Sequence, residues 1–195
     1  NYSSIKEYSF NKIKQKNKNT LIGSYGVDGV KTGKTDAGGY GIVISAQKNN
    51  RRLIAVINGL KSAKDRELEA KKILDFGFLD FKNVTFFQAD KEVYKTDVMY
   101  GDLDQVSLHV RDNVTVTIPI EYKETNDLSF LTQLTKVLKA PIKRGDVLGQ
   151  LKIMDNRRNI LIKEVDLVAN SEVKKSGMIK RFFQIIKYFL KRLIS

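Results

Sequence analysis

Two runs of β-branched residues followed at once by a helical pattern constrain the fold of the first third of the chain. Residues 39–46 and 51–59 are rich in Ile and Val, and the four polar residues between them suit a hairpin turn. In residues 62–76, apolar side chains recur at roughly helical spacing; Ser62 can cap the start of this helix and Gly77 can end it. The pattern predicts an α+β arrangement in which strands are followed by a helix.

A Lys-Thr-Gly triplet at residues 31–33 lies within residues 21–35, which are expected to contain a further short strand. The lysine can offer a fixed positive charge to a carboxylate, and the threonine hydroxyl can donate to the same group. The glycine leaves no side chain on the strand, so a substrate backbone can approach closely. Lys-Thr-Gly is one of three motifs that form the active site of penicillin-recognising serine enzymes, but so short a motif also occurs by chance.

A phosphate-binding P-loop is the alternative at the same place, because residues 29–35 read GVKTGKT. That loop needs four residues between its glycines, and here there are three. It also needs a following apolar helix whose N-terminus faces the phosphates, whereas Asp36, Gly38, Gly39 and a β-branched run follow here. The nucleotide-binding interpretation is therefore rejected.

Longer stretches around the triplet indicate whether it is a chance match or a family motif. The segments SIKEYSFNKIKQKN, VDGVKTGKTDAGGYG, RRLIAVINGL and DRELEAKKILDFGF occur in this order from residue 4 to about residue 82. They resemble the D-alanyl-D-alanine carboxypeptidases among the low-molecular-mass penicillin-binding proteins, and a weaker resemblance continues to the C-terminus. The resemblance implies a serine-type enzyme that binds β-lactams and removes the terminal D-Ala of the peptidoglycan pentapeptide through an acyl-enzyme, without a cofactor or metal.

The resemblance also implies roles for individual residues. Lys31, Thr32 and Gly33 would bind the terminal carboxylate of the substrate. The backbone N–H of Lys34, at a position where the family often has His, would be an oxyanion-hole donor. Arg66 matches a family arginine near the carboxylate site; the alternative for Arg66 is an ordinary helix salt bridge with Asp65 or Glu69.

The nucleophile of the family, which stands in a Ser-x-x-Lys motif, has no convincing match. Ser3 and Lys6 fit the pattern, but they lie in a stretch that resembles the family segment after the second motif, so the fit is interpreted as coincidence. No catalytic side chain is therefore expected in this chain, which is interpreted as the C-terminal part of a longer enzyme and as inactive alone. Its missing N-terminal half is then a candidate partner. The alternative is a non-catalytic, membrane-attached remnant or module of a split gene.

From about residue 83 the sequence changes to short alternating runs separated by turn signals. The runs include residues 84–87, 106–110, 114–118, 147–153 and 159–162. They predict a small antiparallel β domain with few convergent ionisable groups. His109, the only histidine, is expected to be a strand residue rather than a metal ligand. The expected fold is thus part of a penicillin-recognising sheet-plus-helix domain (residues 1–82), a β domain (83–173) and a C-terminal amphipathic helix (174–195).

The last segment is predicted to be an amphipathic membrane anchor. Apolar residues recur there at three- and four-residue steps, and the polar face is basic without an acid. The residues expected at the lipid surface are Phe182, Phe183, Ile186, Lys187, Phe189, Leu190, Lys191 and Arg192. Such a helix is too polar to span a bilayer, and a core-docked helix or a partner-binding helix are the alternatives.

Charge narrows the list of partners. The net charge of +13 admits nucleic acid, an anionic membrane or an acidic polymer. Nucleic acid is not expected, because interleaved aromatics and a helix-turn-helix pattern are missing. The resemblance and the basic terminal segment together predict a peripheral position on the periplasmic face of the bacterial cytoplasmic membrane.

Overall fold

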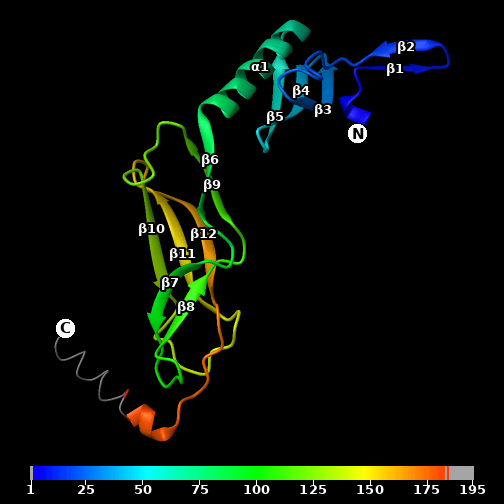
Figure 1. Ribbon diagram of the computed structural model, residues 1–195. Helices are drawn as coiled ribbons and strands as arrows, with labels where there is room; N and C mark the ends of the chain where they lie inside the picture. The colour runs from blue at the N-terminus through cyan, green and yellow to red at the C-terminus, as the bar shows by residue number, and fades with distance from the viewer. Residues whose placement is uncertain (1, 183, 185–195) are drawn as a thin grey trace. The chain divides into compact units, whose positions relative to one another are not determined.

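The computed structural model describes residues 2–182 and residue 184, and the chain divides into two compact units (Figure 1). The first unit comprises residues 1–83 and 118–121, and the second comprises residues 84–117 and 122–195. Within the residues that the structure describes, no helix is long and apolar enough to cross a membrane.

The first unit contains a three-stranded antiparallel sheet in the order β3-β4-β5, with helix α1 packed on it (Figure 1). A short 3-10 helix and a two-stranded hairpin, neither predicted from the sequence, precede the sheet. The elements are η1 (Tyr2–Ser4), β1 (Glu7–Phe10), β2 (Ile13–Lys16), β3 (Val27–Thr35), β4 (Gly39–Lys48), β5 (Arg51–Leu60) and α1 (Ala63–Leu79). The predicted strands and helix are confirmed.

Helix α1 starts where the sequence indicates but ends later. The hydroxyl of Ser62 accepts a hydrogen bond from the backbone N–H of Asp65 at 3.1 Å, which caps the helix start. The prediction that Gly77 ends the helix is wrong, since α1 continues to Leu79 with Asp80 as its C-cap. A Cβ at position 77 would lie 2.5 Å from Leu53 Cδ1. The glycine therefore allows close packing of the helix on β5 rather than a turn.

The second unit is built on a five-stranded antiparallel sheet in the order β10-β11-β12-β8-β7, while β6 pairs with β9 separately. Its interior is formed by Val, Leu and Ile side chains on alternate strand positions, as in a sheet with one buried face. The strands are β6 (Phe81–Phe87), β7 (Glu92–Asp97), β8 (Gln105–His109), β9 (Val114–Pro119), β10 (Leu128–Leu134), β11 (Val147–Asp155) and β12 (Ile160–Ala169). The predicted fold class, with sheet-plus-helix and antiparallel β parts, is confirmed.

Polar residues in this unit are used to hold turns. His109 is buried, and its Nε2 lies 3.3 Å from Asp90 Oδ1. Within the described ranges, no group of three or more His, Cys, Asp or Glu side chains could hold a metal ion. Asp155 is also buried and accepts hydrogen bonds from Tyr122 Oη at 2.9 Å and from the N–H groups of Arg157 and Arg158 at 2.9 and 3.0 Å.

Two carboxylates in these turns, Asp155 and Asp127, have pKa values below the ordinary value. Burial by itself raises the pKa of Asp155, but the hydrogen bonds from Arg158, Tyr122 and Arg157 outweigh it, so the pKa lies below the ordinary value. Arg157 donates two hydrogen bonds of 2.7 Å to Asp127 and is the main reason why the pKa of Asp127 is also lowered. Both carboxylates therefore stabilise the fold in their ionised form.

Acid should consequently destabilise the second unit. A carboxylate with a depressed folded-state pKa stabilises the protein above its unfolded-state pKa, and this stability is lost as the pH falls through the folded-state value. We expect the thermal midpoint, followed by circular dichroism, to fall between neutral pH and pH 3. Asp155→Asn should lower the midpoint at pH 7 and flatten the pH dependence. Asp112→Asn, on an exposed turn, is the control; an equal pH slope in Asp155→Asn and the parent chain would contradict the assignment.

Candidate carboxylate-binding groove

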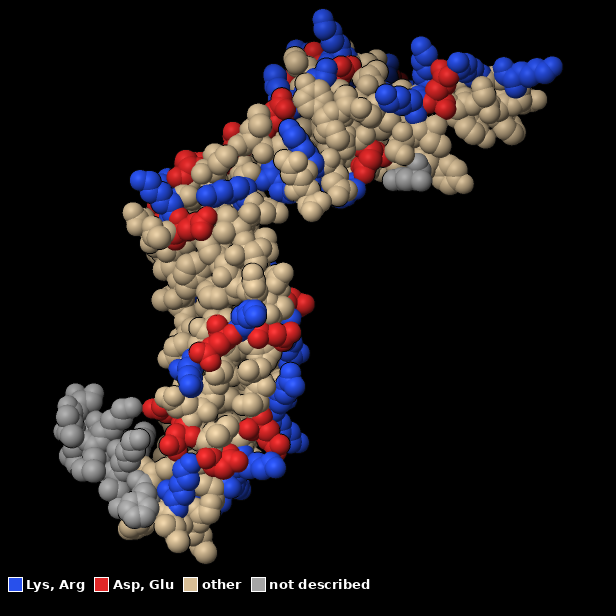
Figure 2. Space-filling view, viewed as in Figure 1, with Lys and Arg blue, Asp and Glu red and all other residues tan. Residues whose placement is uncertain are grey.

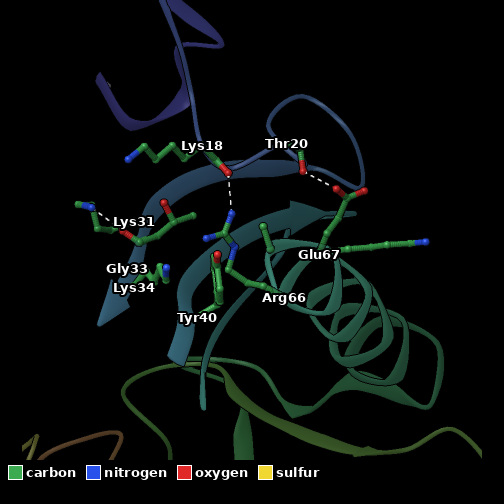
Figure 3. A pocket seen from close by; sticks show the side chains of 11 residues that line it. Lys18, Thr20, Lys31, Gly33, Lys34, Tyr40, Arg66 and Glu67 are labelled. Carbon is green, nitrogen blue, oxygen red and sulfur yellow. Dashed lines mark hydrogen bonds between the residues drawn. The ribbon is translucent and has the colours of Figure 1, made fainter. Parts of the chain in front are cut away.

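An open groove of about 850 Å³ lies in the first unit between β3 and the start of α1 (Figure 3). Four parts of the chain form it: the segment before β3, the Lys-Thr-Gly part of β3, the start of β4 with Tyr40, and the first turns of α1. The residues that line it are Lys18, Thr20, Lys31, Thr32, Gly33, Lys34, Tyr40, Ala63, Lys64, Arg66 and Glu67. The structure thus brings together all the substrate-binding residues predicted in the chain.

Strand β3 is an edge strand, and this position leaves backbone groups available. Its inner side pairs with β4, with Lys31 opposite Val43 and Lys34 opposite Tyr40, and β3 is the last strand of the sheet. Alternate N–H and C=O groups along an edge strand have no partner within the sheet. A Cβ added at Gly33 would meet no atom within 4 Å, so the chain itself does not require a glycine there for packing. The edge is open to an extended ligand.

The side chains of the Lys-Thr-Gly motif differ in their surroundings. Thr32 is buried, whereas Lys31 is exposed and its Nζ donates a hydrogen bond to the backbone carbonyl of Thr32. The carbonyl that Lys31 contacts carries no net charge, so this contact does not neutralise the lysine. An anionic ligand group could replace the carbonyl as the acceptor.

Arg66 is held inside the groove wall. Its Nη2 donates to the carbonyl of Lys18 at 2.9 Å, and its guanidinium lies 5.9 Å from the ring centroid of Tyr40 (Figure 3). Lys34 Nζ lies 5.3 Å from the same centroid, so Tyr40 is close to two cations. Arg66 is 8% exposed; Asp65 accepts a hydrogen bond from the Ser62 hydroxyl, and Glu69 forms an ion pair with Lys72. The helix salt bridge considered for Arg66 is therefore not formed.

The groove is strongly cationic. Five of its lining residues carry positive charge: Lys18, Lys31, Lys34, Lys64 and Arg66. Glu67 is the acid among the described lining residues, and it is bound by Lys71 at 2.7 Å and by the hydroxyl of Thr20 at 2.6 Å. These two donors, Lys71 first, hold the pKa of Glu67 below its ordinary value. The remaining positive potential suits a carboxylate.

The structure also tests each serine that has a lysine three residues later. A Ser-x-x-Lys nucleophile needs a helix, since residues i and i+3 share one helix face but point to opposite faces of a strand. Ser3 lies in η1, which ends before Lys6, and its hydroxyl donates to the carbonyl of Asp28 at 3.2 Å. Inspection of the sequence missed three further matches, Ser9–Lys12, Ser45–Lys48 and Ser171–Lys174. They lie on β1 and its turn, on β4, and in an extended segment, so none of them has the helical geometry.

Residues 174–182 and 184 of the predicted C-terminal anchor lie within the described residues. Contrary to the prediction, residues 174–177 are not helical, and Lys175 pairs with Gly101 instead. The helix begins at Met178, and Phe182 is exposed. Lys180 Nζ lies 3.2 Å from Asp104 Oδ1, and Gln184 Nε2 donates to the same carboxylate at 3.0 Å and to the carbonyl of Gly101 at 3.2 Å. The other predicted membrane residues lie outside the described residues: Phe183, Ile186, Lys187, Phe189, Leu190, Lys191 and Arg192.

A Lys-Thr-Gly edge strand facing a helix across a cationic groove, followed by a β unit, defines a penicillin-recognising protein. Comparison with family models agrees: residues 1–62 match "D-alanyl-D-alanine carboxypeptidase", and residues 81–175 match "Penicillin-binding protein 5, C-terminal domain". The chain belongs to the D-alanyl-D-alanine carboxypeptidase family of low-molecular-mass penicillin-binding proteins, as the C-terminal part.

Individual relatives give the same result. D-alanyl-D-alanine carboxypeptidase DacA of Haemophilus influenzae is 34% identical over 195 residues, covering 98% of this chain and 49% of that protein. The DacA protein of Escherichia coli K12 is also 34% identical, covering 93% and 45%. The crystal structure of penicillin binding protein 5 from H. influenzae superposes with a TM-score of 0.74 at 35% identity, covering 89% of this chain and 50% of that one. This chain thus spans about half the length of the curated relatives it matches.

Proposed function

We propose that this chain forms one wall of the active site of a serine-type D-Ala-D-Ala carboxypeptidase, which removes the terminal D-Ala of the peptidoglycan pentapeptide. The observation that carries the proposal is the open, cationic edge of β3 at the Lys-Thr-Gly motif, where no atom of the described residues lies within 4 Å of a Cβ built at Gly33. The same groove would take the carboxylate of β-lactams, consistent with the family to which the chain belongs.

In this proposal the peptide substrate lies along the outer edge of β3 as an added strand. The ammonium of Lys31 and the hydroxyl of Thr32 bind the terminal carboxylate, and Arg66 adds positive charge from α1. The backbone N–H of Lys34 donates to the carbonyl oxygen that becomes negatively charged in the tetrahedral intermediate. The lysine side chain does not enter this role, since the donor belongs to the backbone.

The reaction needs a nucleophile that this chain does not supply in helical geometry. A serine from outside these 195 residues would attack the penultimate D-Ala carbonyl, and its proton would pass through a base to the leaving amine. Free D-Ala departs, and water then hydrolyses the acyl-enzyme, returning the serine. The chain's own residues bind and orient the substrate. A membrane-attached module without catalysis is the second candidate, favoured by the geometry of the four Ser-x-x-Lys matches.

A fluorescent penicillin separates these possibilities. The chain alone should form no covalent adduct, because no serine among the described residues lies in one helix together with a lysine three residues later. The readout is in-gel fluorescence after denaturation, with an intact D-Ala-D-Ala carboxypeptidase as the positive control. An adduct that disappears when one serine of this chain is replaced would contradict the assignment. Labelling that reappears with a separately supplied N-terminal half would favour the enzyme over the non-catalytic module.

For the location, we propose peripheral attachment to the periplasmic face of the bacterial cytoplasmic membrane through the segment from Met178 to the C-terminus. Its sequence combines an apolar face with a polar face that carries only basic charges. Burial of the apolar face in the lipid boundary and attraction of the basic residues to anionic headgroups support the same orientation.

A further inference from the structure

The end of the second unit from which the C-terminal segment emerges is built from three chain segments. Residues 99–102, 138–142 and 173–176 are joined by backbone pairing: Met99 pairs with Lys139, Gly101 with Lys175, and Ile142 with Val173. The turn between β7 and β8 and the helix that starts at Met178 lie at this same end (Figure 1). The three segments, together with the adjoining turn residues 103 and 137, are therefore treated as one structural surface, here called the terminal surface.

Two aliphatic side chains project from the loops of the terminal surface. Leu103, in the turn between β7 and β8, is 47% exposed, and Val137, between β10 and β11, is 55% exposed. Both loops are fixed by backbone bonds, since Val98 N–H donates to the Asp104 carbonyl at 2.9 Å and Met99 N–H donates to the Leu138 carbonyl at 2.9 Å. Their exposure thus follows from an ordered backbone.

Basic residues flank these aliphatic side chains. Lys136 and Lys139 stand on either side of the Val137 turn, and Lys174 and Lys175 lie on the segment paired with Gly101; all four are exposed. Figure 2 shows Lys and Arg side chains at this end of the unit, together with Asp and Glu side chains and uncharged ones. Aliphatic side chains ringed by lysines are the pattern that inserts into a lipid interface while the ammonium groups contact phosphates.

Two acidic side chains at the same end, Asp102 and Asp104, are engaged within the protein, whereas Glu172 is exposed beside the paired Val173. Asp102 Oδ1 accepts hydrogen bonds from the N–H groups of Leu103 and Lys174, each at 2.9 Å. Asp104 forms an ion pair with Lys180 at 3.2 Å, and the carbonyl of Asp102 accepts a hydrogen bond from Lys180 at 2.6 Å. These contacts also place the first turn of the C-terminal helix, with exposed Met178 and Ile179, beside Leu103.

We propose that the terminal surface is a second membrane-contact site, in which Leu103 and Val137 insert into an anionic lipid interface and the flanking lysines bind headgroup phosphates. The inference rests on the proposed attachment through the C-terminal segment and extends it to the folded β unit. Lipid is favoured over a protein partner because the aliphatic side chains are isolated on two loops, flanked by exposed lysines, and lie at the end of the unit from which a basic amphipathic segment emerges. The helix and the loops together would fix the orientation of the β unit on the membrane.

The absence of tryptophan from the chain permits a direct test of insertion. Leu103→Trp and Val137→Trp are prepared in the full chain and mixed with vesicles of phosphatidylcholine containing phosphatidylglycerol. We expect a blue shift of the tryptophan emission and quenching by brominated lipid acyl chains. Leu131→Trp, on β10, is the matched control, since Leu131 is 53% exposed but lies on the sheet rather than on the terminal surface. Water-like emission at positions 103 and 137 while the chain is vesicle-bound would overturn the proposal.

Flotation with the same vesicles gives the energetic test. The double variant Leu103→Ser/Val137→Ser should bind on the order of tenfold more weakly than the parent chain, through the loss of two inserted aliphatic side chains. Leu131→Ser/Leu161→Ser, which removes similarly exposed side chains elsewhere, should bind like the parent. If both double variants bind equally, the terminal surface is not a membrane-contact site, but the proposed attachment through the C-terminal segment still stands. If the parent chain does not float with the vesicles, both proposals are overturned. Circular dichroism confirms that each variant is folded.

Discussion

Replacing Lys31 by alanine, in an enzyme that contains this chain together with its nucleophile, should slow acylation by penicillin about 10- to 150-fold. Lys31 provides an exposed ammonium at the groove, tied in the free state only to the carbonyl of Thr32 among its recorded partners. A hydrogen bond between charged partners contributes about 1.5–3 kcal/mol, which corresponds to that range of rates. The measurement is the second-order acylation rate with a chromogenic β-lactam and with a D-Ala-D-Ala peptide.

Controls separate binding from folding. Lys48→Ala removes a lysine at the far end of β4, outside the groove, and should leave both acylation rates unchanged. The thermal midpoint of Lys31→Ala should match that of the parent, because an exposed side chain is removed. Equal acylation by Lys31→Ala and Lys48→Ala would exclude the carboxylate role.

Gly33→Ala tests whether the substrate backbone approaches the outer edge of β3. An added methyl group meets no atom of the chain within 4 Å, so stability should be preserved. The methyl group would nevertheless stand where the proposed substrate strand approaches, and acylation should fall. Normal acylation by Gly33→Ala would place the substrate away from this edge of β3.

Local sequence signals predicted the sheet-plus-helix part well. The Ile- and Val-rich runs specify β4 and β5, because β-branched side chains suit a half-buried pleated surface. Ser62 specifies the helix start through a contact only three residues away. The predicted end of the helix was wrong because Gly77 serves close packing against Leu53 rather than a turn. A contact between residues distant in sequence leaves no local pattern that could reveal this.

The candidate groove was predicted only in part for the same reason. The residue types of the Lys-Thr-Gly motif and the resemblance indicated which residues belong to it. The hydrogen bond from Arg66 to the carbonyl of Lys18 joins residues 48 positions apart, and the contact of Tyr40 with two cations depends on strand register. Similarly, a Ser-x-x-Lys pattern can form a nucleophile and base only on a helix. The structure was therefore needed to show that the matches at Ser9 and Ser45 lie on strands.

The polar stretch that precedes the anchor shows the largest difference between sequence and structure. Residues 170–177 are mostly polar, yet Val173 is fully buried and exchanges two backbone hydrogen bonds of 2.9 Å with Ile142. Ser176 N–H also donates to the Tyr100 carbonyl at 2.8 Å. A cut after Asn170 would therefore remove part of the β unit, and the correct boundary for deleting the anchor is after Gly177.

Deleting residues 178–195 should lower the affinity for anionic vesicles by at least about a hundredfold. Each Phe or Leu of the amphipathic face contributes on the order of 1.5–3 kcal/mol at full burial and less at half immersion, so several such residues dominate binding. The basic residues add a part that salt weakens. A weak residual affinity should remain in the truncated chain through Leu103 and Val137, and the Leu103→Ser/Val137→Ser substitutions should remove it.

Flotation of the full and truncated chains at low and high salt measures this loss, and thermal unfolding shows whether the β unit is intact. The deletion removes the exposed Lys180–Asp104 ion pair, which contributes little to stability, and the hydrogen bonds that Lys180 and Gln184 donate to the segment 101–104. The thermal midpoint should therefore stay close to that of the full chain. If truncation lowered the midpoint strongly, the helix would be a docked part of the β unit; if truncation left vesicle binding unchanged, the membrane affinity would reside elsewhere in the chain.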